Sequence, residues 1–86
     1  MHGIGDKLNM DIRVLFIDNG GQRRLLVVYE IGQSENGNVW IENDDYYYES
    51  VNTISDSDYK DLVEFAMIHG YVDLTTIGQF NENSEL

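Results

Sequence analysis

The sequence predicts an α+β fold: an antiparallel three- or four-stranded sheet that begins with a β-hairpin, with one amphipathic helix packed on one face. Two observations predict this class. Apolar runs with a two-residue alternation are separated by Asn-Gly turns in the first half, and a capped pattern with helical spacing follows in the second. The 86 residues suit a single domain, and we expect residues 1–9 and 81–86 to be flexible.

The first two strands form the predicted hairpin. In Met10 to Asp18, apolar residues alternate at first with charged ones, as in a half-buried strand. Asn19-Gly20 tolerates the positive φ angles of a type I′ turn, whose twist suits a hairpin. Gln22 to Ile31 then supplies the partner strand. Its LLVVY run is apolar on both faces and indicates a central position in the sheet.

Two shorter strands are expected next. Val39 to Glu42 follows a second Asn-Gly turn at Asn36-Gly37, and Tyr46 to Val51 follows a polar turn. The second of these strands starts with three consecutive tyrosines. Because neighbouring side chains of a strand point to opposite faces, at least one of the three must face solvent or a partner.

A helix is predicted over Asp56 to His69. Ser55 suits the N-cap, and Asp58 three residues later resembles a capping box. Gly70 is a good terminator in the left-handed conformation. The apolar stripe that should face the core consists of Tyr59, Leu62, Val63 and Ala66.

The segment Tyr71 to Phe80 has two interpretations. Asp73 can cap a short C-terminal helix over Leu74 to Phe80, or Tyr71 to Ile77 can add an edge strand. We favour the short helix.

Charge is distributed unevenly along the chain. The net charge is −11, from 16 acids and 5 bases, yet residues 1–29 carry +1 and residues 30–86 carry −12. The second half therefore attracts basic surfaces and repels nucleic acid and anionic membranes. Three arginines in the first half cannot outweigh this field, so we expect neither direct nucleic-acid binding nor membrane association.

Several kinds of chemistry are excluded or disfavoured. The chain has no Cys, so it has no disulfide, thiolate metal site or cysteine nucleophile. His2 and His69 are the only near-neutral bases, and no catalytic motif is present. The run from Asp56 to Asp61 has Asp61 where a calcium loop requires Gly. We expect no enzymatic activity, no metal and no cofactor.

The densest acids occur between residues 42 and 64 and are mixed with the three tyrosines. Regularly spaced carboxylates on rigid elements can replace phosphates in a basic cleft, and tyrosines are frequent interface anchors. A solvated face without a partner explains the same acids, so both interpretations remain open. The candidate partner-binding residues are Glu42, Asp44, Asp45, Tyr46, Tyr47, Tyr48, Glu49, Asp56, Asp58, Asp61 and Glu64.

The stretch Glu35-Asn36-Gly37-Asn38-Val39-Trp40-Ile41-Glu42 and the acids after it resemble the small phage-encoded anti-CRISPR proteins, in particular the acidic Cas9 inhibitors. The likeness lies in size, acid excess and the order of strands, acids and helix. It implies inhibition by occupation of a basic DNA-binding cleft such as a PAM-reading site. Those inhibitors begin with a helix, whereas this chain begins with a short Gly-containing lead, so no individual contact carries over.

The expected function is therefore a non-enzymatic inhibitor that binds a basic nucleic-acid-binding surface of a larger protein by partial DNA mimicry. The partner would be a CRISPR effector or another nuclease, met in the cytoplasm by a monomer or homodimer of this chain. Two alternatives remain open. One is an immunity protein or antitoxin that neutralises a nuclease, and the other is a small phage structural or accessory module.

Overall fold

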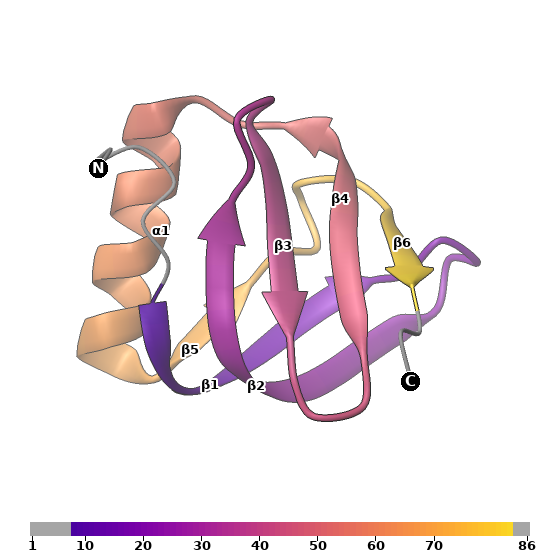
Figure 1. The fold of residues 1–86 in the computed structure, drawn as a ribbon, viewed down its shortest axis with the longest axis horizontal. Helices are drawn as coiled ribbons and strands as arrows, with labels where there is room; N and C mark the ends of the chain where they lie inside the picture. Colours follow the sequence, from indigo (N-terminus) through magenta and orange to yellow (C-terminus); the bar gives the residue numbers. More distant parts are fainter. Residues whose placement is uncertain (1–7, 84–86) are drawn as a thin grey trace.

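The structure is a computed structural model that describes residues 8–83 (Figure 1). It contains a six-stranded mixed sheet, curled into a half-barrel, and one helix. The strand order is β5-β1-β2-β3-β4-β6. The elements in chain order are β1 (Leu8–Ile17), β2 (Arg23–Gln33), β3 (Asn38–Glu42), β4 (Tyr47–Thr53), α1 (Asp56–His69), β5 (Tyr71–Asp73) and β6 (Phe80–Asn83).

The sheet differs from the prediction in size and in direction. β5 pairs parallel to β1, with Val72 opposite Val14, and β6 pairs antiparallel to β4, with Phe80 opposite Ser50. The predicted antiparallel sheet of three or four strands is therefore wrong. Two strands follow the helix. β5 is the edge strand of the alternative interpretation, starting at Tyr71 but ending at Asp73, whereas β6 was not predicted. With three and four residues, both are too short for a two-residue alternation to identify them.

β2 bends along its length, and this bend curls the sheet (Figure 1). Val28 and Ile31 are three residues apart and both are completely buried, so the alternation of faces breaks between them. A bulge in β1 lies opposite this bend. The curl brings the end of β1 to the start of β6, where Asp18 and Phe80 form an isolated bridge. The two ends of the sheet thereby approach each other as in a partly closed barrel.

The core fills the half-barrel between the sheet and α1. The helix begins and ends where the sequence predicts: the Ser55 Oγ accepts a hydrogen bond from the Asp58 N–H, and Gly70 ends it with φ 69°. The Tyr59 hydroxyl donates to the Ile31 carbonyl at 3.3 Å and so ties α1 to β2. The buried apolar residues are Ile12, Val14, Phe16, Val28, Ile31, Val39, Ile41, Tyr48, Tyr59, Ala66, Val72, Leu74 and Phe80.

Both Asn-Gly hairpins form, but their turns are not of type I′. In these two turns the positive φ angles fall on Gly21 and Gly37, and within the described residues no asparagine has a positive φ. The Gly21 N–H bonds to the Asp18 carbonyl at 2.9 Å, and the Gly37 N–H bonds to the Ser34 carbonyl at 2.9 Å. This is the geometry of a three-residue loop in which a turn is followed by a left-handed glycine.

The segment after β5 does not form the predicted short helix. The Asp73 Oδ1 accepts the Thr75 N–H at 2.9 Å, and the Ile77 N–H reaches the Leu74 carbonyl at 3.1 Å, so one turn forms. Gly78 then takes φ 119°, which a helix cannot contain, and the chain enters β6. At the expected flexible ends, residues 8–9 belong to β1 and 81–83 to β6, while 1–7 and 84–86 lie outside the described residues.

Candidate functional site

The acidic segment predicted from the sequence is divided in space. Asp44 and Asp45 lie in the turn between β3 and β4, at the lower end of Figure 1, and Asp56 begins α1 at the upper end. The whole length of β4 separates the turn with Asp44 and Asp45 from the start of α1. The predicted residues therefore belong to two separate surfaces, one on the sheet and one on the helix.

The sheet surface gathers carboxylates and two aromatic rings from three adjacent strands. Because Ile31, Ile41 and Tyr48 point into the core, their neighbours in the chain point outward. Across this outer side Glu42 stands opposite Glu30, and Glu49 stands opposite Trp40. We call this surface the acidic aromatic face; its residues are Glu30, Trp40, Glu42, Tyr47 and Glu49.

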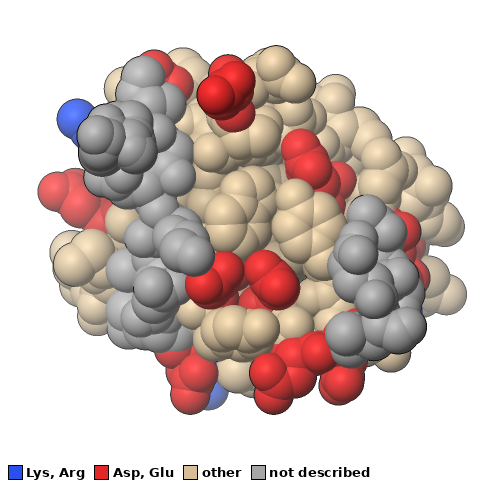
Figure 2. Space-filling model, in the orientation of Figure 1, with Lys and Arg blue, Asp and Glu red and all other residues tan. Residues whose placement is uncertain are grey.

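The side of the molecule on which β3 and β4 lie toward the viewer carries mainly negative charge. Among the residues that the structure describes, Figure 2 shows acidic groups across this side of the molecule and basic groups at its margin. The five residues of the acidic aromatic face are partly exposed. A cationic partner can therefore reach both the carboxylates and the rings.

Gly32 allows Trp40 to lie flat on the sheet. A Cβ atom at position 32 would overlap Cζ2 and Cε2 of the Trp40 ring, so the ring can lie here only because residue 32 is a glycine. The ring in turn stacks with that of Tyr47, with centroids 6.1 Å apart and planes 29° apart. The Tyr47 hydroxyl donates to Glu49 Oε1 at 3.0 Å. The face is thus a platform of two stacked rings with a carboxylate hydrogen-bonded beside them.

The β3–β4 turn extends this platform. Asn43 Oδ1 accepts the N–H groups of Asp45 and Tyr46, both at 2.8 Å, which fixes the turn. Asp44 and Asp45 are exposed, and Tyr46, which precedes β4, keeps 37% of its surface exposed. Strand alternation turns Tyr47 to the outer side, so at least one of the three tyrosines faces outward, as predicted. A small hollow of about 150 Å³ opens here beside Tyr29, Glu42 and Tyr47.

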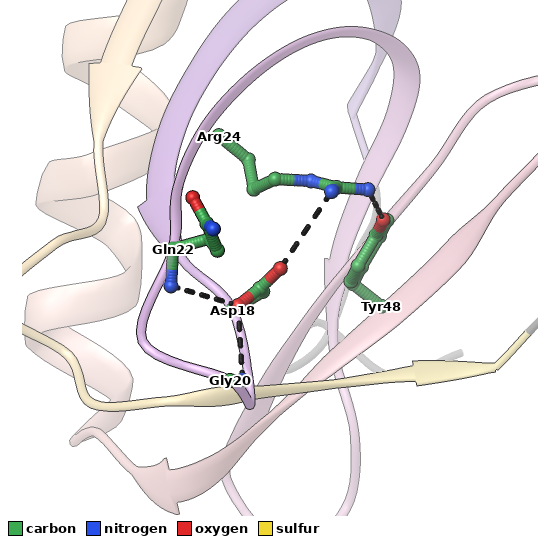
Figure 3. Close-up of polar contacts among 5 residues, drawn as sticks. All are labelled: Asp18, Gly20, Gln22, Arg24 and Tyr48. Carbon is green, nitrogen blue, oxygen red and sulfur yellow. Dashed lines mark hydrogen bonds and ion pairs between the residues drawn. The ribbon is translucent and has the colours of Figure 1, made fainter.

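Tyr48 lies in the core and has no exposed surface, so it is not available as a partner anchor. Its hydroxyl accepts a hydrogen bond from Arg24 Nη2 at 2.7 Å, and Arg24 Nη1 lies 3.7 Å from Asp18 Oδ2 (Figure 3). Burial raises the pKa of Tyr48, while the Arg24 hydrogen bond opposes that change. The hydrogen bond to Tyr48 in turn raises the pKa of Arg24.

Asp18 explains why Arg24 points inward. Its Oδ1 accepts the N–H groups of Gly20 at 2.9 Å and Gln22 at 3.0 Å, which orders the first hairpin turn (Figure 3). Its Oδ2 is left for Arg24. The inner polar group is therefore structural: it joins the hairpin to β4.

The helix acids form the second surface. Asp56 and Glu64 are exposed on α1. Asp58 and Asp61 are exposed as well, and they line a groove between α1 and β5 together with Asp73, which the sequence did not single out as a site residue. Glu30 was also missed, because it precedes the dense acidic segment and joins it only through the pairing of β2 with β3.

The carboxylates and rings of the acidic aromatic face have the chemistry to bind cationic groups. Within residues 8–83 no group of three or more His, Asp or Glu side chains is placed to hold a metal ion. Carboxylates beside aromatic rings attract guanidinium and ammonium groups through charge and through the ring faces. None of the helices among the described residues has the length and apolarity needed to cross a membrane.

Comparison of the chain with protein-family models, with curated proteins and with solved structures gave no match.

Proposed function

We propose that this chain is a non-enzymatic binding protein whose acidic aromatic face occupies a basic, nucleic-acid-binding surface of a larger protein. The observation that carries the proposal is the convergence of Glu30, Glu42 and Glu49 from three strands around the stacked rings of Trp40 and Tyr47. Such a surface is complementary to arginine-rich targets in charge, and its rings can receive guanidinium groups.

The spacing of the carboxylates supports partial mimicry of a nucleic acid. Glu42 pairs with Tyr47, and Glu49 stands two residues further along β4. Diagonal neighbours of this kind lie about 7–8 Å apart, comparable with the interval between phosphates of one strand. When these carboxylates enter a basic cleft, the anions that the cleft holds would be released into solution, as they are when phosphates bind.

The rings of Trp40 and Tyr47 add an aromatic attraction for arginine that phosphates do not provide. A Trp or Tyr face attracts an arginine side chain by roughly 0.5–1 kcal/mol at an exposed site and by more when water is excluded. The chain's net charge of −11 would speed the encounter with a basic partner and make it sensitive to salt. An inhibitor of a CRISPR effector or of another nuclease in the cytoplasm is the version of this function that we favour.

The experiment compares two double variants with equal charge change. Glu42→Gln with Glu49→Gln alters the acidic aromatic face, and Glu35→Gln with Glu64→Gln alters exposed acids elsewhere. Each protein is immobilised and incubated with host-cell lysate at low and high salt, and the retained proteins are eluted with duplex DNA and identified.

The proposal expects nucleic-acid-binding proteins to be retained at low salt, to be displaced by DNA and to be lost from the Glu42 and Glu49 variant alone. Equal loss from both variants would mean that net charge, and not this face, is responsible. Retention that is insensitive to both salt and DNA would refute the mimicry.

A further inference from the structure

A groove of about 590 Å³ runs between α1 and β5. One wall is the side of α1 that carries Asp58, Asp61 and Phe65, and the other is β5 with Tyr71 and Asp73. This volume is within the range of about 300–1,000 Å³ that is typical of ligand-binding clefts. The groove is separate from the acidic aromatic face, which lies on β2, β3 and β4.

The wall formed by α1 mixes acids with an apolar ring. Asp58, Asp61 and Phe65 are three and four residues apart, so they share one side of the helix next to its buried stripe. The Phe65 ring is 48% exposed and packs against the His69 ring, with centroids 4.3 Å apart. An apolar surface is therefore open between charged groups.

The wall formed by β5 places a third carboxylate across the groove. Hydrogen bonds from the Thr75 side chain and backbone, aided by the positive charge of Arg23, lower the pKa of Asp73, which therefore stays ionised at neutral pH. Within the described residues, Asp58, Asp61 and Asp73 do not form a metal-binding cluster. The three aspartates line one groove without converging as metal ligands would, which suits an extended organic cation.

We propose that this groove binds a basic amphipathic peptide segment of a partner protein, with a Lys or Arg side chain among Asp58, Asp61 and Asp73 and an adjacent apolar side chain against Phe65 and Tyr71. Charge complementarity selects the basic residue, and the exposed ring selects its apolar neighbour. The site is a second point of contact, independent of the acidic aromatic face.

The test uses the full chain, labelled with ¹⁵N, and three synthetic hexapeptides. One alternates Arg with Leu, one alternates Arg with Ser, and one alternates Glu with Leu. Amide chemical shifts map the site and give the dissociation constant. Asp58→Asn with Asp61→Asn alters the groove, and Asp56→Asn with Glu64→Gln removes the same charge from exposed positions of α1 outside it.

The Arg-Leu peptide should shift amides of α1 and β5 around the groove, and the Asp58 and Asp61 variant should bind it about fivefold more weakly. The matched control should change affinity by less than about twofold. Phe65→Ala, at a half-exposed position that leaves the core intact, should weaken the Arg-Leu peptide to the level of the Arg-Ser peptide.

Three outcomes would overturn the inference. These are shifts that map elsewhere, equal weakening in both charge variants, or equal binding of the Arg-Leu and Arg-Ser peptides to the unaltered chain. The Glu42 and Glu49 variant should bind the Arg-Leu peptide normally, so failure of this inference and failure of the proposed function are distinguishable.

Discussion

Arg24 and Tyr48 are joined by a 2.7 Å hydrogen bond from the guanidinium Nη2 to the phenol oxygen. Arg24 is on β2 and Tyr48 on β4, with β3 between them in the sheet. The contact is therefore made across the inside of the half-barrel and not along a strand ladder. It links the first hairpin to the strand that carries Tyr47 and Glu49 on its opposite side.

Replacing Tyr48 by Phe should lower the free energy of unfolding by about 1–2 kcal/mol, since a hydrogen bond to a charged group is lost while the ring and its packing remain. The measurement is urea denaturation followed by circular dichroism. Tyr46→Phe is the control, because Tyr46 is exposed and the change should cost less than about 0.5 kcal/mol. Equal effects would contradict the structural role of the Arg24 contact.

The same tyrosine should make the protein sensitive to alkali. Burial raises the pKa of Tyr48 in the folded state, so the folded protein holds the phenol proton more tightly than the unfolded chain does. Its stabilising contribution is complete below the unfolded pKa of about 10 and is lost as the pH rises through the folded pKa. Unfolding free energies of the unaltered chain and Tyr48→Phe, measured from pH 8 upward, should therefore converge above about pH 10. A constant difference would refute this assignment.

Gly32→Ala should displace the Trp40 ring, because the new Cβ would overlap it. We expect a destabilisation of about 1–3 kcal/mol and weaker retention of partners by the acidic aromatic face. Trp40 is the only tryptophan of the chain, so its fluorescence reports the movement directly.

The control for Gly32 is Gly20→Ala. A Cβ at position 20 meets only Asp18 Oδ1, at 3.6 Å, and that glycine does not have a positive φ. The Trp40 fluorescence of the Gly20→Ala variant should match that of the unaltered chain. An unchanged spectrum in Gly32→Ala would mean that the ring does not lie on this glycine.

Ser55→Ala should destabilise the fold by about 0.5–2 kcal/mol, because the first turn of α1 loses the acceptor of the Asp58 N–H at 3.1 Å. Ser57→Ala, inside the first turn, should cost less than about 0.5 kcal/mol. Thermal unfolding of both variants, followed by circular dichroism, provides the comparison. Equal decreases in the melting temperatures of the Ser55→Ala and Ser57→Ala variants would contradict the capping role of Ser55.

The sequence alone determined the elements that depend on neighbours in the chain. The helix is set by the Ser55 cap, the apolar stripe from Tyr59 to Ala66 and the Gly70 terminator, which are all local signals. The first four strands follow from apolar alternation and two Asn-Gly turns. The acidic character of residues 42–64 was likewise visible without a structure.

Only the tertiary structure decided which acids meet. Glu30 joins Glu42 through strand pairing, Asp73 joins Asp58 and Asp61 across a groove, and Tyr48 turns into the core. β5 and β6 form because β1 and β4 offer open edges to segments far away in the chain. Such pairing depends on where the backbone bends, as β2 does after Val28, and no local periodicity encodes that.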